Sequence, residues 1–530
     1  MSDKTSQTQN ARLNLEALRR RAKALRRAYR AGDAEAAARI KAALGEPAPA
    51  ADALKHAQAL LTIAREAGFA SWPRLKLAAE MAAMDRMARA ARLEQALFQG
   101  QHWVVDALLA KDPDLAAASL GLRIALYDRA AVEAALAADP ATATRAVGPS
   151  GDAARIAERR PILHLAFSKH IHAAPQKRGA MLAIAEALLA AGADVNDGFP
   201  AEPGSEHQLS ALYGALGHAD NMALATWLLE NGADPNDNES LYHATELPHR
   251  EGVKLLIRHQ VRIEGTNALP RALDFDDVDT ARLLLEAGAD PNEGAAPHPS
   301  GQPSYVIPAL HQAARRRCSA EMARLLLAHG ADGRTSYREH SAYAYARIYG
   351  NQPIAAALEA AGQATPLSPL EEALAAAAEG RPAAAVAPEA FTQETRRIMG
   401  RILGFGGDLA HAQRLHALGV DPEWEDEMGL PAIHIAGWEG LPDIVRWLLT
   451  LGPDLTRKNA YGGDLMGTII HGAEFSPARE TRDHLGCAEA ALAAGAPLHA
   501  RDVEGCGAEE LAAFLSDWAE RHPERVIAPQ

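Results

Sequence analysis

Leu188–Asn196 reads LLAAGADVN, the end of a leucine-rich helix followed by a glycine and a short polar turn. The same phrase returns as LLENGADPN over 228–236 and as LLEAGADPN over 284–292, and looser copies surround Gly330, Gly419, Gly452 and Gly495. A repeated unit of this size cannot bury its apolar face alone, so neighbouring units must stack. The sequence therefore predicts a stack of repeats that presents a long binding surface rather than a catalytic pocket.

Length, composition and charge narrow the class of protein. The chain has 530 residues, more than one hydrophobic core usually organises, and aromatic residues make up only 5% of it, which is typical of a nearly all-helical protein. Its net charge of −14 makes nucleic acid an unlikely partner and favours basic partners. Three cysteines without close pairing predict no disulfide framework. With neither a signal peptide nor a membrane-length apolar run, we expect a cytoplasmic protein that does not enter a membrane.

The first 80 residues predict a small helical domain. Apolar residues recur at steps of three and four from Leu15 to Tyr29, which predicts an amphipathic helix that breaks at Gly32. A third helix is expected from about Asp52 to Gly68. The stretch GFASWPRL (68–75) then predicts a new helix capped by Ser71, with Phe69 and Trp72 packed between the two helices.

The opposite face of the first helix carries a run of arginines and lysines between residues 12 and 30, against the single acid Glu16. Such a run could contact RNA, anionic lipid or an acidic protein. We favour a solvated face or one docked on this protein's own acidic repeats, because the chain as a whole is negatively charged.

A second recurring motif opens a helix in several units: PILHLA at 161–166, PALHQA at 308–313 and PAIHIA at 431–436. Together with the GAD-x-N phrase, these motifs resemble the ankyrin repeat, whose pattern is T-P-L-H-x-A, a helix turn, and L-L-x-x-G-A-D-x-N. The leader and its GF-x-SWP-x-L step resemble a segment of bacterial ankyrin-repeat proteins. The resemblance implies an all-α ankyrin-repeat solenoid preceded by a small N-terminal helical domain.

The spacing of the turn glycines adds detail to this resemblance. Gly419 and Gly452 are 33 residues apart, one ankyrin unit, whereas the steps from Gly192 to Gly232 and from Gly452 to Gly495 are 40 and 43 residues, which predicts extra residues in loops. Gln260 stands at a glycine position, 28 residues after Gly232. We expect an N-terminal helical domain over 11–80, degenerate helical repeats over 85–147, ankyrin repeats over 160–362, a linker or degenerate repeat over 363–395, and C-terminal repeats with a cap over 396–515.

Several residues could carry chemistry, but each has a structural explanation. His164, His311 and His434 share one repeat position, where the family's histidine bonds to the backbone of the neighbouring loop. The pairs Cys487 with His484 and Cys506 with His499 lack metal-ligand spacing, and no third group completes a nucleophilic site. We therefore expect no metal, no cofactor and no catalytic residue.

Residues 457–485 form the most singular segment, and YGGDLMGTIIHG (461–472) resembles a stretch found in bacterial ankyrin proteins of unassigned activity. Its small residues could admit a partner backbone or simply the neighbouring repeat. An alternative hypothesis places an enzyme or small-ligand-sensor site here, with His471 and Glu474. A third hypothesis is an effector directed into a host.

The leading hypothesis is a non-catalytic scaffold, adaptor or inhibitor that binds a protein partner through the concave side of the repeats. The sequence names no specific partner and sets no oligomeric state. Aromatic residues on exposed loop tips are typical interface anchors. The predicted partner-binding residues are Asp197, Phe199, Asp237, Asn238, Glu293, Tyr305, Tyr337, Trp424, Glu425, Asp426, Trp438 and Tyr461.

Overall fold

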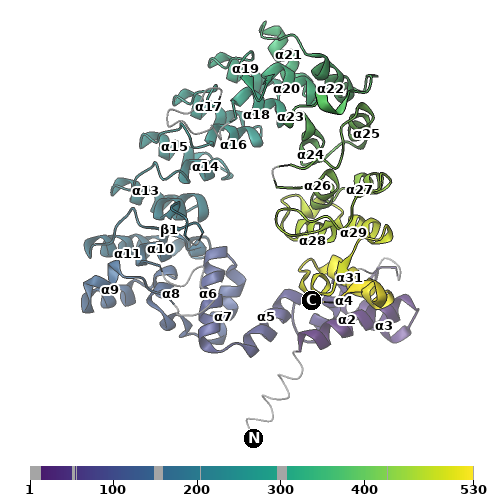
Figure 1. The fold of residues 1–530 in the computed structure, drawn as a ribbon. Helices are drawn as coiled ribbons and strands as arrows, with labels where there is room; N and C mark the ends of the chain where they lie inside the picture. The colour runs from purple at the N-terminus through teal and green to yellow at the C-terminus, as the bar shows by residue number, and fades with distance from the viewer. Residues whose placement is uncertain are drawn as a thin grey trace. The chain divides into compact units, whose positions relative to one another are not determined.

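The computed structural model describes residues 14–50, 54, 56–148, 159–202, 204–294, 307–426 and 428–528. Its described part is predominantly helical, with short strands at a few turns, as the composition predicts (Figure 1). Two compact units can be distinguished. The central unit comprises residues 80–337 and 356–363, and the leader–C-terminal unit comprises the described residues up to Ala79 together with 338–355 and 364–528. Each unit is described separately.

The central unit is built from successive pairs of short helices. These elements are α6 (Arg86–Gln99), α7 (His102–Lys111), α8 (Leu120–Ala125), α9 (Arg129–Ala138), α10 (Pro161–Ala166), α11 (Arg178–Ala190), β1 (Gly198–Pro200), β2 (Gln208–Ser210), α12 (Ala211–Tyr213), α13 (Met222–Glu230), α14 (Ser240–Ala244), α15 (Glu251–Arg258), α16 (Ala268–Asp274), α17 (Val278–Glu286), α18 (Ala309–Arg315), α19 (Ala320–Ala328) and β3 (Ser336–Tyr337).

The helix pairs stack in sequence order. The first helices form one row, in which α8, α10, α12, α14, α16 and α18 each contact the next, and the second helices α9, α11, α13, α15, α17 and α19 form another. Leucines and alanines of both rows are buried between the pairs, for example Leu188, Leu228 and Leu284 at the recurring helix ends. Stacking thus buries the apolar face that a single pair would expose.

The unit that exceeds the usual repeat length carries its extra residues in a hairpin. Strands β1 and β2 pair antiparallel, with Gly198 opposite Ser210, between the turn at Gly192 and helix α12. The expected loop insertion in the 40-residue step from Gly192 to Gly232 is confirmed here.

Gln260 adopts the backbone conformation of the glycine that it replaces. Its φ is 58°, while the equivalent Gly232 and Gly288 have φ of 93° and 100°. A residue with a Cβ pays for the left-handed conformation, whereas glycine does not.

We therefore expect Gln260→Gly to stabilise the chain by about 0.5–1 kcal/mol, because the relief of left-handed strain exceeds the added entropy of the unfolded glycine. Urea unfolding of the two proteins measures the difference. Gly232→Ala should shift the midpoint in the opposite direction, and an unchanged or lower midpoint for Gln260→Gly would contradict this account.

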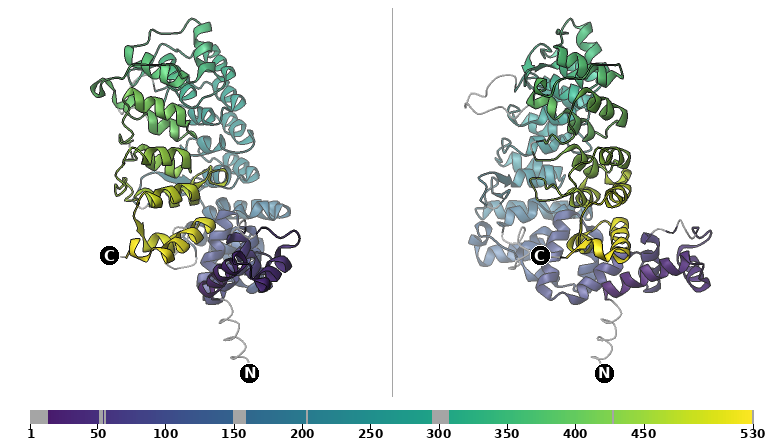
Figure 2. Two further views of the ribbon diagram at one scale, coloured as in Figure 1. Left: turned by 90° about the vertical axis from the view of Figure 1, so that its right-hand side faces the viewer. Right: turned by 45° about the vertical axis from the view of Figure 1, so that its right-hand side comes forward.

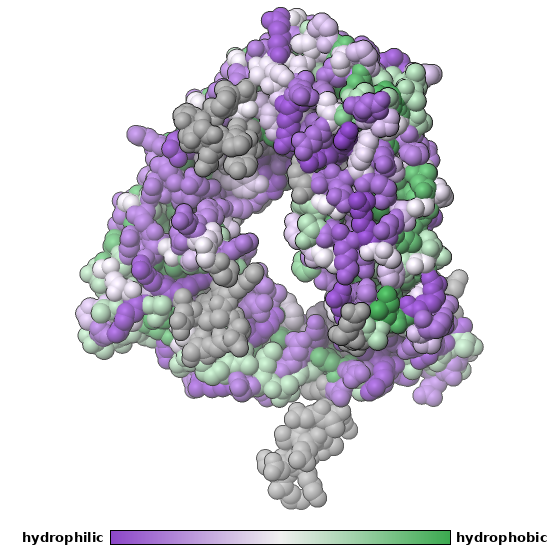
Figure 3. All heavy atoms as spheres, in the orientation of Figure 1, coloured by the Kyte–Doolittle hydropathy of each residue, from purple (hydrophilic) through white to green (hydrophobic). Residues whose placement is uncertain are grey.

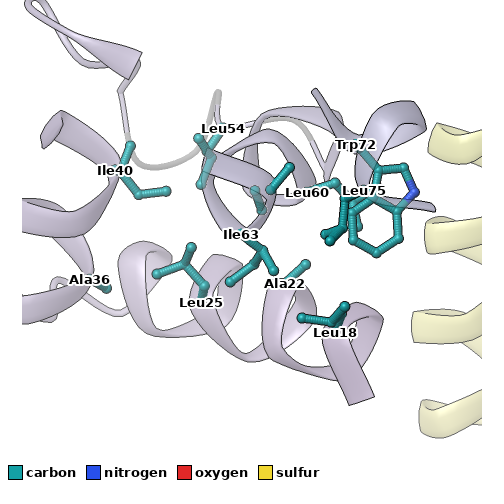
Figure 4. Packing of buried hydrophobic residues seen from close by; sticks show 12 residues of the cluster. Leu18, Ala22, Leu25, Ala36, Ile40, Leu54, Leu60, Ile63, Trp72 and Leu75 are labelled. Carbon is teal, nitrogen blue, oxygen red and sulfur yellow. The ribbon is translucent and has the colours of Figure 1, made fainter. Parts of the chain in front are cut away.

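The leader forms a small helical bundle with its own core. Helices α2 (Leu15–Arg30) and α3 (Ala34–Leu44) are separated at Gly32, with Asp33 capping α3, and α4 (His56–Glu66) ends before Gly68. Helix α5 (Trp72–Ala83) begins one residue after Ser71, as predicted. The shared core is drawn in Figure 4 and contains Leu18, Ala22, Leu25, Ala36, Ile40, Leu54, Leu60, Ile63, Trp72 and Leu75, with Phe69 packed against it.

The remaining elements of the leader–C-terminal unit are again helix pairs. They are β4 (His340–Ser341), α20 (Ala342–Ile348), α21 (Gln352–Ala360), α22 (Pro369–Glu379), α23 (Gln393–Arg396), α24 (Ile398–Leu403), α25 (Leu409–Leu418), α26 (Ala432–Trp438), α27 (Pro442–Leu449), α28 (Leu465–Phe475), α29 (His484–Ala493), β5 (Leu498–His499), α30 (Ala500–Gly505), α31 (Glu509–Arg521) and β6 (Val526–Ile527).

The segment 363–395 contains an ordered helix. Helix α22 begins with a capping box between Ser368 and Glu371 and ends at Gly380 in the left-handed conformation. It packs on α20 before it and on α25 after it, and the stack continues from α24 to α26 and α28. Helix packing within this unit is therefore continuous across the segment.

The leader packs on the other end of the same unit. Helix α4 contacts α31, the last long helix, and both views in Figure 2 show the two ends of the chain side by side. Arg26 lies 3.8 Å from Asp517 and Arg27 lies 3.7 Å from Glu520. Part of the basic face is thus docked on acidic residues of the same chain, one of the two interpretations that the sequence favours.

The face shown in Figure 3 is mainly hydrophilic, with hydrophobic residues in small groups among charged and polar ones. Within the described ranges, no helix is both long and apolar enough to cross a membrane.

Candidate functional site

The predicted tip residues Asp197 and Phe199 do not lie on an open surface. Asp197 is only 5% exposed and forms an ion pair with Arg160, and its backbone carbonyl accepts a 2.8 Å hydrogen bond from Ala211. The ring of Phe199 lies 5.0 Å from that of Phe167, and the Arg159 guanidinium lies 3.6 Å from its centre. The sequence-based placement of these two residues on an exposed tip is therefore corrected: the β1–β2 hairpin folds them inward.

Three further tip residues of the central unit hold loops together. The Asp237 carboxylate accepts hydrogen bonds from the Ser210 and Ser240 hydroxyls at 2.5 and 2.6 Å. The Glu293 carboxylate accepts the Gly265 amide at 2.5 Å. Asn238 is exposed and has a φ of 65°.

Tyr337 is half-buried, with its ring 5.6 Å from that of His311. Tyr305 lies outside the described residues. Because most tip residues of the central unit are engaged in its own packing, this unit offers few free aromatic anchors among the described residues.

The tip that follows Gly419 contains Trp424, Glu425 and Asp426. Trp424 is half-buried, with its ring 5.4 Å from that of Phe391 and with the Arg396 guanidinium 5.3 Å above it. Asp426 accepts the backbone amides of Met428 and Leu430 at 2.8 and 2.9 Å. Glu425 is exposed and pairs with Arg457 at 2.7 Å.

Adjacent tips present a second apolar pair to solvent. Tyr461 is 77% exposed and Met428 is 42% exposed. The Tyr461 hydroxyl lies 3.2 Å from the Met428 sulfur, and the Ala460 amide donates a 3.1 Å hydrogen bond to the Met428 carbonyl. The two positions are separated by 33 residues, so they are equivalent in consecutive repeats.

An aromatic strip, formed by Trp438, His471 and Phe475, crosses the first helices of two consecutive pairs. The ring of His471 lies 5.1 Å from that of Trp438 on α26 and 4.7 Å from that of Phe475 on its own helix α28. Trp438 is half-buried, His471 is exposed, and Phe475 is 59% exposed. Both Tyr461 and Phe475 belong to the singular segment 457–485, so this segment carries much of the exposed aromatic surface that the structure describes.

Glycine at position 472 allows α28 to approach α26. A Cβ built there would lie 2.4 Å from the Trp438 carbonyl oxygen and 2.8 Å from its Cα. The same carbonyl accepts a 2.9 Å hydrogen bond from the ring of His484. Gly472 therefore admits the neighbouring repeat, which explains this glycine of the unusual motif by internal packing.

The alternative catalytic pair is engaged elsewhere. His471 stacks in the aromatic strip, while the Glu474 carboxylate accepts a 2.5 Å hydrogen bond from the Gly507 amide. Burial raises the pKa of Cys487 to about 12 and that of Cys506 to about 11, which disfavours their thiolates. Among the described residues, no group of three or more histidine, cysteine or acidic side chains is arranged to hold a metal ion.

Sequence reasoning missed Met428 and Phe475. Phase along the helix could have found Phe475, because it follows His471 by four residues and so lies on the same helical face. The 33-residue period could have found Met428 from Tyr461.

Comparison with known proteins agrees with the repeat geometry. Residues 212–295 match the family model described as ankyrin repeats in three copies. This chain contains ankyrin repeats. Among solved structures, the ankyrin repeat domain of Bcl-3, described as a unique member of the IkappaB protein family, is 21% identical and covers 43% of this chain and 92% of that chain, with a TM-score of 0.19. A comparison with curated proteins gives no match.

The shared histidines of the ankyrin repeats are structural groups. His164 and His311 are 5% and 1% exposed, and His164 bonds to the backbone carbonyl of Val147 in the preceding loop, as predicted. His434 instead lies 3.3 Å from the Thr468 hydroxyl on the next first helix. Burial lowers the pKa of His434 to about 4, so its ring is neutral near neutral pH.

Proposed function

We propose that this ankyrin-repeat protein is a non-catalytic scaffold, adaptor or inhibitor that binds a protein partner through its C-terminal repeats. The contact surface comprises the aromatic strip (Trp438, His471 and Phe475) and the neighbouring tips with Trp424, Glu425, Asp426, Met428 and Tyr461. Ankyrin repeats support protein binding in general, and this proposal narrows the surface to one part of the stack. Unpaired cysteines suit a reducing compartment such as the cytoplasm.

The observation that carries the proposal is the exposure of Tyr461 and Phe475. An exposed large aromatic side chain gains about 1.5–3 kcal/mol when it is buried, so paired exposed rings are well suited to anchor a partner. Trp438 and His471 stack against Phe475 and hold it in place, which lowers the entropy cost of binding.

The test compares the wild type with Tyr461→Ala/Phe475→Ala in affinity capture from the native organism, followed by titration with the purified partner. We expect the dissociation constant of the double variant to rise at least about tenfold, as for interface hot spots. Both side chains are exposed, so thermal unfolding should change little.

Phe275→Ala is the matched control, because Phe275 is 55% exposed but lies in the central unit. It should bind the partner as the wild type does. Equal binding by the double variant and the wild type would refute the proposed surface.

A further inference from the structure

A pocket of about 650 Å³ lies in the leader–C-terminal unit, between the turn at Arg338 and Glu339 and the segment that leads into α23 and α24. It is separate from the aromatic strip. Its lining comprises Arg338, Glu339, Glu389, Ala390, Phe391, Thr392, Gln393, Glu394 and Arg397. These residues offer three carboxylates, two guanidinium groups and a buried aromatic ring, so the pocket is equipped for a charged ligand.

The charge of Glu394 is already balanced within the protein. Glu394 is only 4% exposed, and its carboxylate accepts hydrogen bonds from Arg338 at 2.9 Å and from the Tyr345 hydroxyl at 2.8 Å. Arg401 pairs with the same carboxylate. Arg338 is thereby committed to Glu394, which leaves less positive charge for a ligand.

The two other carboxylates of the pocket are free of such contacts. Glu339 and Glu389 are both exposed, and within the described ranges neither forms a hydrogen bond or an ion pair. They belong to segments far apart in the sequence but line one pocket. A cationic group placed between them would gain two partners and displace none.

The backbone at Glu339 is strained. Arg338 and Glu339 have φ of 50° and 73°, and they are the two residues between β3 and β4. Such positions favour asparagine and glycine, because a Cβ is unfavourable there. Charged residues at both positions indicate that their side chains are needed: Arg338 holds Glu394, and Glu339 reaches the pocket.

We propose that this pocket binds an arginine side chain of a basic partner segment, held between the carboxylates of Glu339 and Glu389. A planar guanidinium can donate to both carboxylates, and the net charge of −14 attracts a basic segment. Phe391 and Ala390 provide an apolar wall for the arginine stem. This inference rests on the proposed function, because it specifies the chemistry of part of the protein partner.

The test uses the full chain and a fluorescent Gly/Ser peptide that carries spaced arginines, with binding followed by anisotropy. Matched peptides carry citrulline, which keeps the shape and removes the charge, or glutamate. We expect the wild type to bind the arginine peptide and neither of the others. Glu339→Gln/Glu389→Gln should weaken binding about tenfold, the scale of lost charge-assisted hydrogen bonds.

Asp443→Asn/Glu480→Gln is the matched control, because it removes two exposed negative charges elsewhere in the same unit. It should bind the peptide nearly as the wild type does. An equal loss in both double variants, equal binding of the citrulline peptide, preference for the glutamate peptide, or no binding by the wild type would each overturn the proposal.

Two additional variants separate this site from a structural role and from the aromatic strip. Glu339→Gly should weaken arginine-peptide binding severalfold without lowering the unfolding temperature, because glycine relieves the turn strain. A lower unfolding temperature or unchanged binding would contradict the assigned role. Tyr461→Ala/Phe475→Ala should retain arginine-peptide binding, so failure of the pocket and failure of the proposed surface give different results.

Discussion

Glu394→Ala is expected to destabilise the chain by about 3–5 kcal/mol, the usual cost of removing one partner from a buried ion pair. The carboxylate is 4% exposed and receives Arg338, Arg401 and the Tyr345 hydroxyl. Its loss leaves the Arg401 guanidinium, whose side chain is 13% exposed, without its carboxylate partner. Urea unfolding measures the loss, and hydrogen exchange in α20, α23 and α24 should report it locally.

The effect should depend on pH in one direction. Burial raises the pKa of Glu394, but Arg401, Arg338 and Tyr345 outweigh burial, so the pKa is lowered overall. A carboxyl with a lowered folded-state pKa contributes stability above its unfolded pKa and loses that contribution as the pH falls through the folded value.

The stability difference between the wild type and Glu394→Gln should therefore shrink as the pH falls below the ordinary range of glutamate. Glu389→Ala, on the same segment but exposed, serves as the control and should unfold like the wild type. A Glu394→Ala protein as stable as that control would refute the role of the buried network.

Gly472→Ala is the second change with a large expected effect. Its Cβ would lie 2.4 Å from the Trp438 carbonyl oxygen, and a backbone atom in a packed helix cannot move aside as a flexible side chain can. We expect a loss of about 2–3 kcal/mol, at the upper end of the cost of overpacking. The displaced α28 should also disturb the stacking of His471 on Trp438, and partner binding should weaken as well.

Gly467→Ala provides a control within the same helix. A Cβ at Gly467 would meet only the Asp464 carboxylate, at 3.6 Å, which is an ordinary contact. Because alanine is the better helix former, we expect this variant to be as stable as the wild type or more stable by up to about 1 kcal/mol. If both alanine variants unfold alike in thermal and urea melts, close packing at Gly472 is not the reason for the glycine.

Repeat phasing and local signals were enough to predict the helices. The GAD phrases mark the ends of α11, α13 and α17, and the P-x-x-H motifs begin α10, α18 and α26. Gln260 was identified as a glycine substitute from spacing alone, and its positive φ agrees. These features depend on contacts within one repeat or with the next, so they follow from residues close together in the sequence.

The choice among predicted surface residues was less successful. Position on a loop tip predicted Phe199 and Tyr461 alike, yet Phe199 packs on Phe167 and Arg159 while Tyr461 is 77% exposed. The difference arises because the β1–β2 hairpin turns one tip inward, and a hairpin of this kind has no repeat-wide signature.

The sequence by itself thus determined the helix pairs, their turns and their stacking order, because a periodic pattern records which face each helix must bury. Only the tertiary structure decided which side chains meet across distant segments. Arg338 and Glu394 are 56 positions apart, and Arg26 meets Asp517 from the other end of the chain. No local period encodes such contacts, since they depend on how successive repeats add up in space. The aromatic strip and the arginine pocket are features of that kind.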